Sequence, residues 1–144
     1  MDAYSGAGGI ALWLAAKGKR VIAIEQLPAA MEDARLSAKT NGINQCQFLA
    51  GNVEEHAPRV ILEEGVHTFI VDPPRKGCSD KVIKTLMESQ PEQIIYVSCN
   101  PATLARDLEK LKGYSIKDLR VIDMFPQTHH IETAVLLQQD AATV

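Results

Sequence analysis

Short apolar runs alternate along the chain with segments whose apolar residues recur at helical spacing. The apolar runs predict strands over residues 20–25, 46–50, 67–71, 93–97, 121–124 and 133–137. The segments between them predict helices over residues 28–40, 53–64, 81–88 and 102–112. Strands that alternate with helices indicate an α/β fold, with a mostly parallel sheet and helices on both faces. The last two strands are expected to pair as an antiparallel C-terminal hairpin.

Residues with special backbone preferences mark the starts of several helices. Pro28 and Pro101 suit the first helical turn, because proline lacks an N–H that this turn would leave unpaired. Ser79 and Asp80 can cap the helix that follows them. These signals agree with the boundaries that the apolar pattern predicts.

Chemically distinctive residues follow the ends of the strands: Asp2-Ala3-Tyr4, Glu25, Asp72-Pro73-Pro74 and Ser98-Cys99-Asn100. In an open α/β sheet, ligands bind at the carboxyl ends of the strands, so we expect the chemistry to collect along one edge. The apolar residues of a first, central strand are largely missing before Asp2. We therefore expect residues 1–144 to form a single domain that is a fragment of a longer protein.

Composition narrows the class of protein. The chain has 144 residues, of which 46% are hydrophobic and 23% charged, as in a globular domain that buries a core. It shows neither an apolar run of membrane-spanning length nor a secretory signal, so a cytoplasmic protein is expected. The net charge of −3 argues against a domain that holds nucleic acid by bulk electrostatics alone.

The cysteines and adjacent histidines do not indicate a metal site or a disulfide framework. The 3 cysteines, Cys46, Cys78 and Cys99, include no CxxC pair. His129 and His130 are neighbours in an extended segment, so they should point to opposite faces and chelate poorly. We expect no metal, and we interpret a cysteine in a polar motif as a candidate nucleophile.

A glycine turn near the start of the chain has the features of a ligand-binding turn. Gly6 and Gly8 permit a tight strand-to-helix turn that a ligand can approach closely. Glu25, about 20 residues further on, is suited to accept hydrogen bonds from ribose hydroxyls. A dinucleotide fingerprint would need glycine at the position of Ala11, which argues against a dehydrogenase. The pattern resembles that of class I methyltransferases; the alternative is a plain turn and a solvated Glu25.

The segment Asp72-Pro73-Pro74-Arg75-Lys76-Gly77 follows another strand. The two prolines stiffen the backbone and would present Asp72 at the ligand edge. Many base-modifying methyltransferases have a similar Asp/Asn-Pro-Pro loop, although a rigid surface turn is the other interpretation. Asn52, after the third strand, could contact an adenine or could be an ordinary turn residue.

Two further motifs identify a family by resemblance. Ser98-Cys99-Asn100-Pro101-Ala102-Thr103-Leu104-Ala105-Arg106-Asp107 follows a strand, and residues 123–132 read DMFPQTHHIE. Both resemble motifs of the RNA uridine-5-methyltransferases, which make 5-methyluridine in tRNA and ribosomal RNA. The resemblance covers residues 2–137, with the motifs in the family's order. It implies a Rossmann-like class I methyltransferase domain that uses S-adenosylmethionine.

The chemistry of that reaction requires a nucleophile and a base. A thiolate that adds to carbon 6 of uracil makes carbon 5 nucleophilic, and the carbon 5 proton must then be removed. Cys99 stands before a predicted helix, whose dipole favours a thiolate. Glu132 enters an apolar strand, where partial desolvation suits a base. The alternatives are an inert buried cysteine and a carboxylate in solvent.

The resemblance also implies the binding residues and the partner. Those expected to bind the cofactor are Tyr4, Gly6, Gly8, Glu25, Asn52 and Asp72. Arg75, Asn100 and Pro101 are expected to contact RNA, with ribosomal RNA favoured over tRNA and the protein acting as a monomer. The family's upstream glutamine motif and N-terminal RNA-binding domain are not in this chain. Two alternatives stay open: a methyltransferase of another substrate, or a domain that binds the cofactor without turnover.

Overall fold

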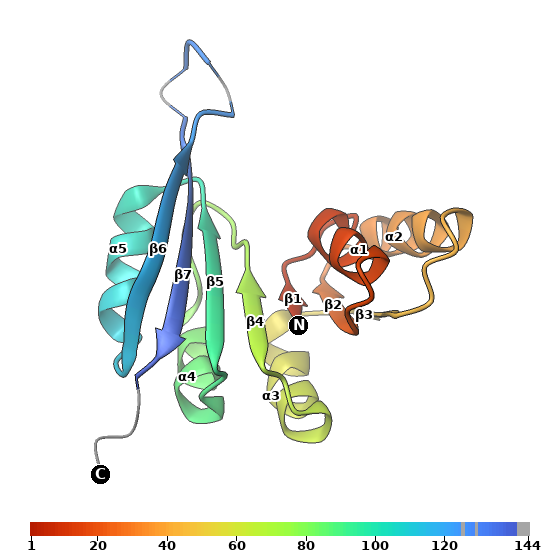
Figure 1. The fold of residues 1–144 in the computed structure, drawn as a ribbon, viewed down its shortest axis with the longest axis horizontal. Coiled ribbons are helices and arrows are strands. Elements are labelled where there is room, and N and C mark those ends of the chain that lie inside the picture. The colour runs from red at the N-terminus through yellow and green to blue at the C-terminus, as the bar shows by residue number, and fades with distance from the viewer. Residues whose placement is uncertain (125, 129, 141–144) are drawn as a thin grey trace. The chain divides into compact units, whose positions relative to one another are not determined.

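A computed structural model describes residues 1–124, 126–128 and 130–140 of the chain. The described residues divide between two compact units, Met1–Glu64 and Gly65–Val144. Both units combine parallel strands with helices (Figure 1). No helix within the described ranges has the length and apolarity needed to cross a membrane.

The first unit is a parallel α/β arrangement. Its strands are β1 (Asp2–Ala3), β2 (Val21–Glu25) and β3 (Cys46–Ala50), and its helices are α1 (Gly9–Ala16), α2 (Pro28–Thr40) and α3 (Val53–Glu64). β2 lies between β1 and β3 and is parallel to both. Ala3 pairs with Ile24, and Glu25 pairs with Ala50, so the three strands end at the same edge.

The core of the first unit explains why β2 is its central strand. Val21 and Ala23 are buried in a cluster with residues of α1 and α2, including Met31 and Ala34. Side chains alternate between the faces of a strand, so the buried Ile22 and its neighbour Ile24 face the other side, where α3 contacts β2. A strand covered on both faces is apolar along its buried length, as β2 is from Val21 to Ile24.

The second unit joins parallel strands to an antiparallel pair. Its strands are β4 (Thr68–Val71), β5 (Gln93–Ser98), β6 (Tyr114–Ile122) and β7 (Glu132–Gln139), and its helices are α4 (Asp80–Ser89) and α5 (Pro101–Lys110). β5 is parallel to β4 and antiparallel to β7, which pairs in turn with β6. Both helices lie behind these strands in the view of Figure 1.

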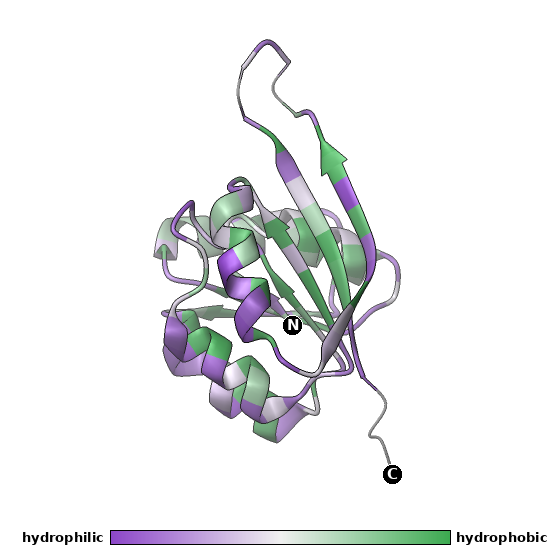
Figure 2. Ribbon diagram, turned by 90° about the vertical axis from the view of Figure 1, so that its left-hand side faces the viewer, coloured by the Kyte–Doolittle hydropathy of each residue, from purple (hydrophilic) through white to green (hydrophobic). Residues whose placement is uncertain are grey.

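One face of β5 and β7 carries the apolar core of the second unit. Ile94 and Tyr96 are fully buried, and they pair with the buried Leu137 and Val135. The Tyr96 hydroxyl donates a hydrogen bond to Asp107 of α5, which places that helix on this face. In Figure 2, hydrophobic colouring is frequent along the strands, whereas hydrophobic and hydrophilic residues alternate along the helices.

The first strand agrees with the sequence-based expectation, whereas the C-terminal hairpin differs from it in extent. The first strand, expected to be largely missing, has only the two residues of β1. β6 begins at Tyr114 rather than at 121, and its pairing with β7 shifts between Ile116 and Asp118. Such an irregularity interrupts the alternation of side chains on which strand prediction depends.

Candidate active site

The first unit brings its candidate cofactor residues to the carboxyl ends of its strands. Tyr4 follows β1, Glu25 ends β2, and Asn52 lies just beyond β3. Tyr4 has a backbone φ of +63°. A non-glycine residue in this left-handed region is strained, and such strain clusters at functional sites. The placement agrees with the edge predicted from the sequence.

The Glu25 carboxylate is bonded to the glycine turn itself. Its Oε2 accepts a hydrogen bond of 3.1 Å from the Gly6 N–H, and its Oε1 accepts one of 2.8 Å from the Leu27 N–H. Each carboxylate oxygen has a second lone pair, so both can still accept hydrogen bonds from a ligand. Glu25 is therefore held in a fixed orientation while keeping capacity to bind vicinal hydroxyls.

The glycine turn leaves room for a ligand. Gly6 and Gly8 have φ of +54° and +82°, which side chains rarely tolerate. A Cβ added at Gly6 would meet no atom within 4 Å, so the backbone is open there. Among the described residues, the buried Ser5 hydroxyl oxygen has no hydrogen-bond partner. An open backbone and an unsatisfied polar atom suit a turn that receives a polar ligand.

Asn52 immediately precedes α3 and contacts the first turn of that helix. Its carbonyl accepts the N–H groups of Glu55 and His56, and its side-chain amide donates to the Glu55 carboxylate at 3.2 Å. These contacts are typical of a residue that stands at the N-terminus of a helix. Asn52 nonetheless remains exposed at the same edge as Glu25.

In the second unit, strand register brings Cys99 and Glu132 together. Ser98 and Thr133 form the last pair between β5 and β7. Cys99 follows Ser98 and Glu132 precedes Thr133, so both stand immediately beyond that pair at the same end of the antiparallel strands. Both side chains are half-buried. The two residues expected to supply nucleophile and base are thus neighbours, although they are 33 positions apart in the sequence.

Asp72 adjoins this end of the sheet. It follows Val71, which pairs with Tyr96 of β5. Partial desolvation and then the negative charge of Glu132 raise the pKa of the Asp72 carboxyl above its ordinary value. Two carboxyl groups that sense each other's charge lie close together, so Asp72 belongs to the same cluster as Glu132.

The turn that carries Cys99 is held by hydrogen bonds on both sides of the cysteine. The Ser98 hydroxyl donates to the Asn100 carbonyl and accepts the Asn100 N–H, both at 3.0 Å. The Asn100 side chain caps α5 by accepting the Ala102 N–H at 3.1 Å. Pro101 occupies the first position of α5, as predicted. Cys99 therefore lies at the N-terminus of a capped helix, where the helix dipole favours an anion.

Residues 72–79, between β4 and α4, are called the Asp72 loop. Among the three expected RNA contacts, Asn100 has a structural partner in this loop. Its side-chain amide donates to the Arg75 carbonyl at 3.2 Å. The side chains of Arg75 and Pro101 are exposed and available to a ligand.

The other two cysteines stand in unsuitable surroundings for a nucleophile. Burial, followed by the charge of Asp2, raises the pKa of Cys46 to about 11, so its thiolate is scarce at neutral pH. Cys78 is only 4% exposed, which keeps substrates from its sulfur. Of the three cysteines, Cys99 is the best placed to act as a nucleophile.

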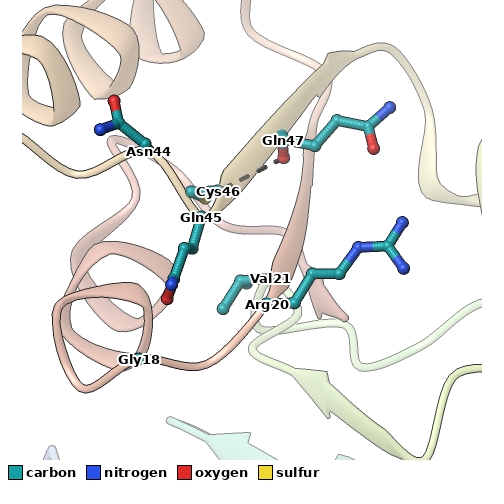
Figure 3. A pocket seen from close by; sticks show the side chains of 7 residues that line it. All are labelled: Gly18, Arg20, Val21, Asn44, Gln45, Cys46 and Gln47. Carbon is teal, nitrogen blue, oxygen red and sulfur yellow. Dashed lines mark hydrogen bonds between the residues drawn. The ribbon is translucent and has the colours of Figure 1, made fainter.

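The first unit also has a hollow of about 450 Å³ (Figure 3). It is lined by Gly18, Arg20, Val21, Asn44, Gln45, Cys46 and Gln47. These residues lie at the N-terminal ends of β2 and β3, whereas Glu25 and Asn52 lie at the carboxyl ends. The hollow therefore contains none of the predicted site residues.

Within the described ranges, no three His, Cys, Asp or Glu side chains are grouped so that they could hold a metal ion. Two residues of the predicted DMFPQTHHIE segment, Phe125 and His129, lie outside the described residues. His130 is described, and its backbone N–H donates to the Thr128 hydroxyl at 3.2 Å.

The sequence did not reveal the role of Asp107. It is fully buried, and its carboxylate accepts hydrogen bonds from the Tyr96 hydroxyl and the Cys78 N–H. Asp107 shares a helical stripe with the apolar Leu104 and Leu111. A carboxylate on an otherwise apolar stripe is the signal that could have identified it.

Comparisons with known proteins show similarity to RNA methyltransferases. The chain is 44% identical over 142 residues to an uncharacterized RNA methyltransferase of Clostridium acetobutylicum, covering 96% of this chain and 31% of the relative. It is 48% identical over 141 residues to another from Enterococcus faecalis, covering 95% and 31%. The chain thus spans about a third of the length of these curated relatives.

A solved structure and a family model give the same result. The structure of Pyrococcus abyssi tRNA (uracil-54, C5)-methyltransferase, in complex with S-adenosyl-L-homocysteine, is similar with a TM-score of 0.86 and 37% identity. The similarity covers 94% of this chain and 33% of that one, which supports a Rossmann-like methyltransferase fold. The family model of tRNA (uracil-5-)-methyltransferases matches residues 1–140. The chain belongs to the tRNA (uracil-5-)-methyltransferase family.

Proposed function

We propose that this chain is the catalytic domain of a longer RNA methyltransferase that transfers a methyl group to carbon 5 of a uridine. The observation that carries the proposal is the neighbouring position of Cys99 and Glu132 at one end of β5 and β7. A thiol and a carboxyl group in that relation match the two roles that the reaction demands.

The features of the first unit fit S-adenosyl-L-methionine as the methyl donor. Glu25 would accept hydrogen bonds from the ribose hydroxyls, and the open turn at Gly6 would admit the ligand to the backbone. Tyr4, Gly8, Asn52 and Asp72 complete the proposed binding set. When bound, this cofactor supplies an electrophilic methyl group. The relative from Pyrococcus abyssi, whose structure contains S-adenosyl-L-homocysteine, supports the choice.

Cys99 and Glu132 divide the remaining chemistry. The Cys99 thiolate adds to carbon 6 of the uracil and makes carbon 5 nucleophilic. After carbon 5 has received the methyl group, the Glu132 carboxylate takes the proton from that carbon. The electrons of the broken C–H bond restore the double bond between carbons 5 and 6, and the Cys99 thiolate leaves. Asp72, close to Glu132, would help to orient the reacting groups.

Ribosomal RNA is the substrate expected from the sequence, and tRNA is the alternative that the Pyrococcus relative favours. The net charge of −3 indicates that other parts of the longer protein supply much of the affinity for RNA. Methylation assays on separately purified ribosomal and transfer RNA would decide between the two substrates.

The mechanism is tested by trapping its covalent intermediate. The complete protein is incubated with S-adenosylmethionine and RNA that contains 5-fluorouridine, and its intact mass is measured. Fluorine at carbon 5 cannot be removed as a proton is, so an adduct should accumulate and map to Cys99. Cys99→Ala should form no adduct, whereas the matched variant Cys46→Ala should form it normally.

The negative outcomes identify the alternatives. If cofactor and RNA both bind but no adduct forms, the uridine-5 assignment is wrong, and a methyltransferase acting on another substrate replaces it. Cofactor binding without methylation of any RNA would instead indicate a binding domain without turnover.

A further inference from the structure

The loop after β4 is attached to α5 through main-chain atoms. The Asn100 amide donates to the Arg75 carbonyl at 3.2 Å, and the Thr103 hydroxyl lies 3.2 Å from the same oxygen. One turn further along, the Arg106 guanidinium donates to the Lys76 carbonyl at 2.8 Å. These side chains are spaced by three residues and therefore occupy one face of the helix.

Asp107 completes this face with a buried carboxylate. Its Oδ2 accepts the Cys78 N–H at 2.8 Å and the Tyr96 hydroxyl at 2.6 Å. Its Oδ1 accepts two hydrogen bonds from Arg106, at 2.9 and 2.8 Å. We call Asn100, Thr103, Arg106 and Asp107, with Tyr96 of β5, the α5 clamp. Burial is the main cause that raises the pKa of Tyr96, so its hydroxyl keeps the proton that it donates.

Gly77 allows the loop to approach the clamp so closely. Its φ of +79° lies in the left-handed region. A Cβ at this position would come within 2.5 Å of an Asp107 carboxylate oxygen and 2.6 Å of an Arg106 nitrogen. A side chain and the clamp could not occupy this space together without movement of one of them.

The clamp surrounds the turn that carries Cys99. Tyr96 lies on the strand that enters this turn, and Asp107 lies on the helix that leaves it. Their hydrogen bond joins the two arms, while Asn100, next to Cys99, is bonded to the loop that begins at Asp72. We propose that Asp107 and Tyr96 are positioning residues for the methyl-transfer reaction, which fix the Cys99 turn relative to the Asp72 loop. This inference rests on the proposed function.

The energetics of the clamp favour a role in geometry over one in stability. The Asp107 carboxylate is buried while its partner Arg106 is exposed, and the cost of desolvating a buried charge offsets much of the attraction within such a pair. Apolar residues of similar size would fill the same space at lower cost. A network whose polar groups are all satisfied instead selects a single arrangement of the segments it joins. A nucleophile that must attack one carbon atom needs such an arrangement, since small misplacements reduce rates strongly.

The test compares Tyr96→Phe and Asp107→Asn with Ile94→Val in the complete protein. Ile94 is buried on the same face of β5 but belongs to neither the clamp nor the proposed site, so its variant controls for lost core packing. For each protein we would measure urea unfolding, methylation kinetics, the rate of adduct formation with 5-fluorouridine RNA, and amide hydrogen exchange over residues 75–78 and 99–104.

The clamp variants should lower kcat and the adduct rate by about five- to fiftyfold, with KM for S-adenosylmethionine within about twofold of the original. In the clamp variants, amide hydrogen exchange should accelerate in residues 75–78 and 99–104 together. Ile94→Val should change neither the rates nor the exchange beyond its effect on stability. Equal effects in Ile94→Val, or unchanged exchange in the clamp variants, would overturn the inference.

Adduct formation by the unaltered protein separates this inference from the proposed function. If the unaltered protein forms no adduct, the proposed function fails and the catalytic role of the clamp fails with it. If the unaltered protein forms the adduct and the clamp variants react at its rate, the positioning role alone is wrong.

Discussion

The candidate catalytic residues differ in how their positions are determined. Cys99 is held by its neighbours in sequence, through the hydrogen bonds of Ser98 and Asn100. Glu132 is instead placed by strand pairing with β5. A substitution at either residue removes a chemical group while leaving these backbone contacts in place, so its effect should appear in one step of the reaction.

Glu132→Gln should trap the reaction after methyl transfer. Glutamine cannot remove the carbon 5 proton, so Cys99 should remain attached to ordinary, methylated uridine. We expect turnover to fall by about 10²–10⁴-fold, as for loss of a general base. Intact-mass measurement after mixing with unmodified RNA and S-adenosylmethionine should show the adduct. Full turnover in this variant would remove Glu132 from the mechanism.

Glu25→Gln should weaken cofactor binding without affecting the nucleophile. Replacing the carboxylate removes charge-assisted hydrogen bonds to hydroxyl groups, a change that corresponds to about 10- to 100-fold in affinity. Titration calorimetry with S-adenosylhomocysteine measures the effect. Glu32→Gln, an exposed change on α2, is the matched control. An affinity equal to that of the control would assign the ribose contact to another residue.

Asp72→Asn should raise thermal stability at neutral pH. The pKa of Asp72 is raised in the folded protein, so the unfolded chain loses this proton at a lower pH than the folded one. Stability therefore declines as pH rises from the ordinary Asp pKa of about 4 through the raised folded value. The variant lacks this penalty. Because solvent still reaches this exposed residue and screens its charge, we expect a Tm increase of only about 1–3 °C at pH 7, and less at pH 4. A lower Tm at pH 7 would contradict the expectation.

At the scale of elements, the sequence predicted those that have clear periodicity and end signals. The bounds of α2, β3 and α3 agree with the prediction, since proline, Asn-Gly and polar turn residues mark their ends. β6 was predicted too short because polar residues and a register shift obscure its alternation. Contacts between distant segments were also missed. The pairing of Tyr96 with Asp107 depends on how α5 packs on β5, which no local pattern reveals.

Replacing Gly77 in the Asp72 loop should destabilise the protein for a steric reason. Gly77→Ala combines a left-handed backbone with a clash against the α5 clamp, and we expect it to cost about 2–4 kcal/mol in free energy of unfolding. Gly113 has a similar φ, +82°, but open space around it, so Gly113→Ala should cost only about 1 kcal/mol. Urea denaturation compares the two. Equal costs would show that backbone conformation alone matters at Gly77.

At the scale of the whole molecule, the proposed chemistry is divided between the two compact units. The residues proposed to bind the cofactor, other than Asp72, belong to the first unit, whereas Cys99 and Glu132 belong to the second. With a net charge of −3, the chain does not offer RNA a generally basic surface. Local cations such as Lys76, exposed beside the proposed site, should therefore account for its phosphate contacts.

The salt dependence of RNA binding measures those contacts. If Lys76 meets a phosphate, Lys76→Ala should reduce the slope of log K against log salt concentration by about 1 in the complete protein. Fluorescence anisotropy with labelled RNA over a range of salt concentrations supplies the slope. Lys39→Ala, exposed at the end of α2, should leave the slope unchanged. Identical slopes for both variants would place Lys76 away from RNA.

The way in which α5 holds the Asp72 loop has a consequence for evolution and redesign. Side chains of α5 donate hydrogen bonds to the carbonyl oxygens of residues 75 and 76. These hydrogen bonds do not depend on which side chains residues 75 and 76 carry. Related proteins could thus exchange those side chains, and acquire different substrate preferences, while inheriting the support of the nucleophile unchanged. Libraries that vary positions 75 and 76 but retain glycine at 77 should accordingly yield folded proteins at high frequency.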